Sequence, residues 1–149
     1  MQPVLVLLLD DDADFLELER KIFQSRGYEV SGHHDPPSAL AALADHARQG
    51  RRILIVCDLM MKALDSGFTF ARTVKGDPRF RDIPVIIVSA IASQKGFDFH
   101  PRTPEDLAGM NADAFFDKPV QPQALLAAAE KLLAGGTPAG ASPAGGMPA

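Results

Sequence analysis

The chain has 149 residues, of which 46% are hydrophobic and 23% are charged, and its formal net charge is -4. This composition is typical of a globular domain with a hydrophobic core and argues against a disordered chain. Because it has no dense Lys/Arg cluster and no apolar run long enough for a bilayer, we expect neither direct nucleic-acid binding nor a membrane segment. The single cysteine, Cys57, allows no internal disulfide, which favours a reducing, cytoplasmic compartment.

The first part of the chain alternates between strand and helix patterns. Residues 4–9 form a continuous apolar run, typical of a strand buried on both faces. Apolar residues at helical spacing follow, with Asp12 placed to cap the helix and Glu19 among its polar positions. A short strand is then expected at residues 28–31, and a helix with proline in its first turn is expected over about 36–49.

The same alternation continues to the end of the last helix. Strands are expected at residues 53–57, 85–88 and 114–116, and helices at about 68–75 and 123–134. This order of elements requires right-handed crossovers and a parallel sheet with helices on both faces. The sequence therefore predicts one α/β domain.

The composition changes abruptly at Gly135. Residues 135–149 contain only Gly, Ala, Pro, Ser, Thr and Met, which cannot build a core and are typical of a flexible tail or linker. We therefore expect one folded domain over residues 1–134, followed by this tail.

Polar side chains stand where four of the expected strands end. The first strand leads to Asp10 and Asp11, the third to Asp58, the fourth to Ser89 and the fifth to Lys118. The carboxyl ends of parallel strands meet at one edge of the sheet, where such folds place their sites. Three neighbouring carboxylates repel one another unless a cation lies among them, and oxygen ligands of this kind suit Mg²⁺ or Mn²⁺. The hydroxyl and ammonium groups can bind the remaining oxygens of a phosphoryl group.

These motifs resemble the receiver domain of two-component response regulators, the CheY-like family. The likeness rests on L-L-L-D-D-D, I-V-C-D-L-M-M, I-P-V-I-I-V-S-A and F-F-D-K-P, which occur in this order and each end a strand. It covers almost the whole chain before Gly135. The resemblance implies a flavodoxin-like (βα)5 three-layer sandwich whose five parallel strands have the order 2-1-3-4-5.

The resemblance also implies a role for the acidic residues. Asp58 would be the aspartate that accepts a phosphoryl group, and Asp11 would be a direct ligand of Mg²⁺ (or Mn²⁺). Asp10 would be an outer-shell acidic partner of the metal, and the backbone carbonyl of Met60 would be a third protein ligand.

Three residues of the last two strands and their ends complete the implied site. Ser89 would be the switch hydroxyl, Lys118 the phosphate-binding lysine and Phe115 the aromatic switch residue. A cis peptide bond between Lys118 and Pro119 is also expected, since the turn has to aim the lysine over the strand ends.

By this likeness the chain is a phosphorylation-dependent signalling switch whose own chemistry is limited to self-phosphorylation and self-dephosphorylation. The phosphoryl group would come from a histidine kinase or a phosphotransfer protein. The output would be a downstream protein target or a detached output domain, and the chain would be a monomer or a phosphorylation-dependent dimer.

The sequence departs from the family pattern at three places. Lys62 stands where the family usually has proline, and the loop with Asp65-Ser66-Gly67 is one residue longer than usual. The segment between Ser89 and Lys118 is also longer, with an insertion expected at residues 96–104 and a short helix at about 104–110.

Two other functions fit parts of the sequence. L-L-L-D-D-D-A-D also matches the opening of haloacid-dehalogenase-like phosphatases, with Asp10 as nucleophile and Asp12 as acid/base, although no cap domain and no later acidic motif is visible. A pseudo-receiver, which binds a partner without being phosphorylated, would accommodate Lys62 and the altered loop.

Overall fold

A computed structural model describes residues 3–58, 66–89 and 111–135. Its centre is a five-stranded parallel sheet of order β2-β1-β3-β4-β5, which confirms the predicted order and fold class. The strands are β1 (Leu5–Leu9), β2 (Glu29–His33), β3 (Ile53–Asp58), β4 (Val85–Ser89) and β5 (Ala114–Asp117). The described helices are α1 (Ala13–Gln24), α2 (Pro36–Arg48), α3 (Ser66–Gly76) and α6 (Pro122–Leu133).

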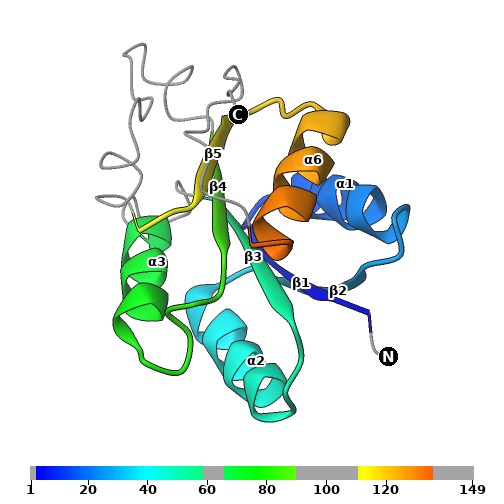
Figure 1. The fold of residues 1–149 in the computed structure, drawn as a ribbon. Helices are drawn as coiled ribbons and strands as arrows, with labels where there is room; N and C mark the ends of the chain where they lie inside the picture. Colours follow the sequence, from blue (N-terminus) through cyan, green and yellow to red (C-terminus); the bar gives the residue numbers. More distant parts are fainter. Residues whose placement is uncertain (1–2, 59–65, 90–110, 136–149) are drawn as a thin grey trace.

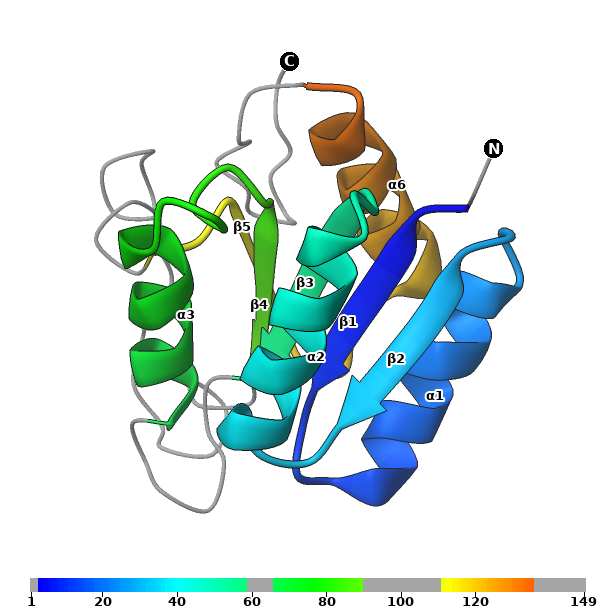
Figure 2. The ribbon, with the colours of Figure 1, turned by 90° about the horizontal axis from the view of Figure 1, so that it is seen from below.

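The helices cover the sheet in two layers. Helices α1 and α6 lie on one face and α2 and α3 on the other (Figures 1 and 2). Alternate residues of β1 divide between the two cores, with Leu7 packed toward α2 and α3 and Leu8 toward α1 and α6. Burying each such leucine stabilises the fold by about 1.5–3 kcal/mol. The central strands therefore pack against helices on both faces of the sheet.

Several boundaries differ from those predicted. Strand β2 continues to His33 instead of ending at residue 31, because each of its residues pairs with β1 as far as the Leu9–His33 pair. Helix α3 begins at Ser66, two residues earlier than expected. The expected helix at 104–110, the insertion at 96–104 and the tail after Gly135 lie outside the described residues.

The loop after β1 is fixed by two aspartate side chains. Oδ1 of Asp10 accepts a hydrogen bond from the backbone N–H of Asp12 at 2.9 Å. Asp12, as predicted, is the N-cap of α1, and its Oδ1 accepts from the N–H groups of Asp14 at 3.0 Å and Phe15 at 3.2 Å. A cap of this kind contributes about 1 kcal/mol. The hydrogen bond from the Asp12 N–H holds the Asp10 side chain at the sheet edge.

None of the described helices combines the length and apolar character that a membrane crossing requires. The peptide bond between Lys118 and Pro119 is cis, as expected from the sequence.

Candidate functional site

Three aspartates meet at the carboxyl edge of the sheet. Strands β1 and β3 pair in register with Leu9 opposite Cys57, so the next residues, Asp10 and Asp58, lie side by side. Together with Asp11 they each offer a carboxylate oxygen, and these oxygens lie within 4.8 Å of one another. The sequence thus located the acidic cluster correctly.

Burial gives this cluster its chemical character. Asp10 is 1% exposed and Asp58 is 5% exposed, whereas Asp11 is half-buried. Water screens charges poorly in such a place, so the repulsion between the carboxylates is strong. The oxygen donors and their spacing suit a hard divalent cation.

Lys118 brings a positive charge to the same pocket. Its Nζ donates a hydrogen bond to Oδ2 of Asp10 at 3.0 Å and lies 3.5 Å from Oδ2 of Asp58. The ammonium group also lies 4.0 Å from the centre of the Phe15 ring, within the range of a cation–π contact. The side chain of Lys118 is only 17% exposed, so the lysine is enclosed by the carboxylates on one side and α1 on the other.

These contacts shift the pKa values of both partners. Burial raises the pKa of Asp10, although the Asp12 N–H and the Lys118 ammonium group both favour its charged form. Burial by itself lowers the pKa of Lys118, but the carboxylates of Asp10 and Asp58 outweigh that effect and the pKa is raised. The lysine therefore stays charged at neutral pH.

Ser89 and Phe115 belong to the two strands beyond Asp58. Ser89 is the last residue of β4, is fully buried, and accepts the backbone N–H of Lys118 at 2.9 Å through its carbonyl. Phe115 lies within β5 with a fully buried side chain in the core that α2 and α3 cover. Met60 and Lys62 lie outside the described residues.

One buried acid near the site was misjudged from the sequence. Glu19 of α1 was expected on the polar side of the helix, but it is only 2% exposed. Burial raises its pKa to about 9, and the charges of Asp10 and Asp58 contribute to the shift. A signal was available, because Glu19 stands four residues after Phe15 and three before Ile22, at the spacing of the buried helix face.

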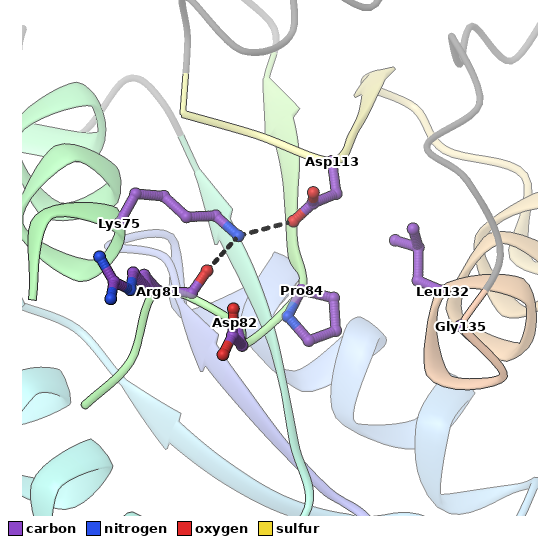
Figure 3. A pocket seen from close by; sticks show the side chains of 7 residues that line it. All are labelled: Lys75, Arg81, Asp82, Pro84, Asp113, Leu132 and Gly135. Carbon is purple, nitrogen blue, oxygen red and sulfur yellow. Dashed lines mark hydrogen bonds and ion pairs between the residues drawn. The ribbon is translucent and has the colours of Figure 1, made fainter. Parts of the chain in front are cut away.

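The opposite end of the sheet carries an open hollow of about 270 Å³ (Figure 3). Its lining residues are Lys75, Arg81, Asp82, Pro84, Asp113, Leu132 and Gly135. Figure 3 shows the Lys75 ammonium group turned toward Asp113, to which it donates at 2.9 Å, and it also donates to the Ile83 carbonyl at 2.8 Å. The lysine is therefore engaged in holding the fold.

Comparison with known proteins places the chain in a family. The family model described as the response regulator receiver domain matches residues 6–130. The response regulator PleD of Caulobacter vibrioides is 39% identical over 87 residues, which are 58% of this chain but 18% of PleD. The polar-differentiation response regulator DivK of Brucella anthropi is 30% identical over 118 residues, which are 79% of this chain and 86% of DivK.

A solved structure agrees with these matches. The chemotaxis response regulator CheY4 of Vibrio cholerae has the same fold, with a TM-score of 0.68 and 23% identity, over 88% of this chain and 99% of CheY4. The family match, the sheet order and the acidic pocket lead to one conclusion: the chain belongs to the response regulator receiver domains, which act as phosphorylation-dependent switches in two-component signalling.

Proposed function

We propose that Asp58 accepts the phosphoryl group, and that Mg²⁺ (or Mn²⁺) is held by Asp11, Asp58 and the backbone carbonyl of Met60, with Asp10 as their acidic partner. The observation that carries this proposal is the position of the Asp58 carboxylate, at the end of β3, within 4.8 Å of the other two carboxylates and 3.5 Å from the Lys118 ammonium group. Among the residues that the structure describes, three carboxylates lie beside one ammonium group, which leaves negative charge that a divalent cation would offset.

The reaction is the capture of a phosphoryl group by a carboxylate. An oxygen of Asp58 forms a bond to phosphorus while the bond between phosphorus and the donor's nitrogen or oxygen breaks, and the donor leaves with that electron pair. When bound, the cation would offset the negative charge that accumulates on the phosphoryl oxygens. Lys118 would release Asp58 and bind one of those oxygens, and water would later hydrolyse the acyl phosphate.

Ser89 and Phe115 would convert this chemistry into a change of surface. The Ser89 hydroxyl would bind a phosphoryl oxygen, because Ser89 ends the strand next to β3. The hydrogen bond from the Lys118 N–H to the Ser89 carbonyl links the ends of β4 and β5, so the two phosphate-binding groups would move together. Phe115, one strand further out, would then adjust its packing, which biases the two-state surface.

The family and the lengths of the relatives support a set of expected partners. A histidine kinase or a phosphotransfer protein would supply the phosphoryl group in the cytoplasm. The chain spans 18% of PleD and 53% of the response regulator Rre1 of Synechocystis, so residues 1–134 would be the receiver and residues 135–149 a tail or a linker. The output would be a protein target or a separate output domain, with the chain as a monomer or a phosphorylation-dependent dimer.

No observation favours the other two functions. A dehalogenase-like phosphatase would need Asp10 as its nucleophile, and a pseudo-receiver would bind a partner without being phosphorylated. The family model that matches is that of the receiver domain.

Intact-mass spectrometry tests the proposal. The wild-type chain, incubated with a small-molecule phosphodonor and Mg²⁺, should gain the mass of one phosphoryl group. Asp58→Asn should gain none, whereas Asp45→Asn, which changes an exposed aspartate of α2, should behave like the wild type. A wild-type chain that stays unmodified would support the pseudo-receiver alternative.

A further inference from the structure

Glu19 is an acid in a place where an apolar residue would stabilise the fold. Its side chain lies in the layer between α1 and the sheet, where its neighbours along the helix, Leu16, Ile22 and Phe23, are all buried and apolar. It makes no hydrogen bond or ion pair with any residue that the structure describes. An ionisable side chain that is only 2% exposed destabilises a protein relative to an apolar one, and such residues persist mainly where function requires them.

The position of Glu19 connects it to Lys118. Phe15 and Glu19 are four residues apart on α1, so they are neighbours on the same face of the helix. The Lys118 ammonium group lies over the Phe15 ring at 4.0 Å. The charges that act on Glu19 are those of Asp10, Lys118 and Asp58, that is, of Lys118 and its two carboxylate partners. Glu19 is thus the polar residue one turn after Phe15 on the buried side of α1, the helix that the lysine touches.

We propose that Glu19 is a positioning residue for Lys118, whose carboxyl group gives the ammonium group a polar neighbour on the α1 side of the pocket. The inference rests on the proposed function of Asp58. Before phosphorylation Lys118 lies 3.5 Å from Oδ2 of Asp58, the nucleophile. The lysine has to leave this oxygen before it can bind the phosphoryl group.

The cost of that movement depends on what surrounds the ammonium group. In a poorly solvated pocket, a cation that leaves a carboxylate is stabilised by any polar group within reach and destabilised by an apolar wall. With an apolar residue at position 19, the ammonium group would have polar neighbours only on the side of Asp10 and Asp58. It would then stay paired with Asp58 for longer. Glu19 therefore lowers the barrier to phosphorylation while it weakens the fold, a known form of trade-off between stability and activity.

Two kinds of substitution separate polarity from shape. Glu19→Met and Glu19→Leu fill the site with an apolar side chain, whereas Glu19→Gln keeps its shape and polarity. Because burial raises the pKa of Glu19 to about 9, the native side chain is neutral at pH 7 and Gln reproduces its charge. Glu17→Gln and Glu17→Met, at an exposed position of the same helix, are the matched controls.

The measurements are the rate of phosphorylation by a small-molecule phosphodonor at saturating Mg²⁺ and the urea midpoint of unfolding. We expect the apolar variants to be phosphorylated about fivefold more slowly, although their unfolding midpoints rise. Glu19→Gln should stay within about twofold of the wild-type rate, as should both Glu17 variants.

Several results would overturn this inference. Apolar variants that react at the wild-type rate would show that Lys118 does not need Glu19. A Glu19→Gln variant as slow as Glu19→Met would show that polarity is not the cause, and a loss of both rate and stability in the two apolar variants would assign Glu19 to the fold alone. If the wild-type chain itself takes up no phosphoryl group, the proposed function fails and this inference fails with it.

Discussion

The ammonium group of Lys118 lies 3.0 Å from Oδ2 of Asp10, although the two residues are 108 positions apart in the sequence. Asp10 follows β1 near the centre of the sheet, whereas Lys118 follows β5 at its edge. The backbone hydrogen bond from the Lys118 N–H to the Ser89 carbonyl holds Lys118 next to the end of β4. From there the long side chain of Lys118 reaches the acidic cluster. One ion pair thus joins the residues that follow the first and the last strand of the chain at the proposed reaction site.

The acidic cluster predicts a divalent-cation site. Mg²⁺ should bind the wild-type chain saturably and raise its stability, by about 1.4 kcal/mol for each tenfold excess over the dissociation constant. Asp11→Ala removes one of the three carboxylates and should weaken binding by about tenfold or more. NMR shifts followed during a Mg²⁺ titration would measure both effects.

An exposed acid at the start of α1 serves as the control for this titration. Asp14→Ala changes a residue in the first turn of α1 and should leave the affinity unaltered. An equal affinity in the Asp11→Ala variant and the wild type would contradict the site.

The buried Glu19 predicts an unusual dependence of stability on pH. Its pKa is about 9 in the folded chain and near 4.5 when unfolded, so between these values the folded state holds a proton that the unfolded state has lost. The free energy of unfolding should therefore fall as pH rises, with a contribution from Glu19 of about 1.4 kcal/mol per pH unit. Below pH 4.5 both states hold this proton, so Glu19 no longer makes the free energy of unfolding depend on pH.

Urea unfolding between pH 5 and pH 8 would measure the effect. Because Glu19→Gln cannot titrate, its stability relative to the wild type should increase steadily with pH, whereas Glu17→Gln should follow the wild-type curve. A constant difference between Glu19→Gln and the wild type over this range would mean that Glu19 is ionised in the folded chain.

The pair at the opposite end of the sheet should matter for stability and not for phosphorylation. Asp113 accepts hydrogen bonds from the Lys75 ammonium group at 2.9 Å and from the Val85 N–H at 2.8 Å, and both charged side chains are largely buried. Asp113→Ala removes both hydrogen bonds, takes this acceptor from the Val85 N–H, and should lower the free energy of unfolding by about 1–3 kcal/mol. Chemical denaturation and phosphorylation assays on the same variant would test both halves of this statement.

Asp45→Ala is the matched control, because the pair of Asp45 with Arg48 is exposed. Its loss should cost less than about 1 kcal/mol. Asp113→Ala would contradict the structural role if its stability equalled that of Asp45→Ala.

The strands and the acidic cluster were predictable for a simple reason. Continuous apolar runs identify strands that are covered on both faces, and parallel strands bring the residues that follow them to one edge. Asp10, Asp58 and Lys118 therefore meet as expected. The end of β2 was less predictable, because pairing with β1 continues through Gly32 and His33, which carry no apolar signal.

Glu19 shows where the sequence-based reasoning failed. A charged residue was taken as exposed, but α1 packs its Glu19 face onto the sheet because Leu16, Ile22 and Phe23 on either side drive that packing. The burial of a single polar position depends on this tertiary packing and cannot be derived from its residue type. The predictions for Met60, Lys62 and the insertion at 96–104 remain predictions, since these positions lie outside the described residues.

The most direct test of the account locates the phosphoryl group on the chain. After incubation with a small-molecule phosphodonor and Mg²⁺, reduction with borohydride would convert an acyl phosphate into a stable mark at the modified aspartate, and peptide mapping by mass spectrometry would locate it. We predict the mark on Asp58 and its loss in Asp58→Asn. A mark on Asp10, or one that persists undiminished in Asp58→Asn, would contradict the account.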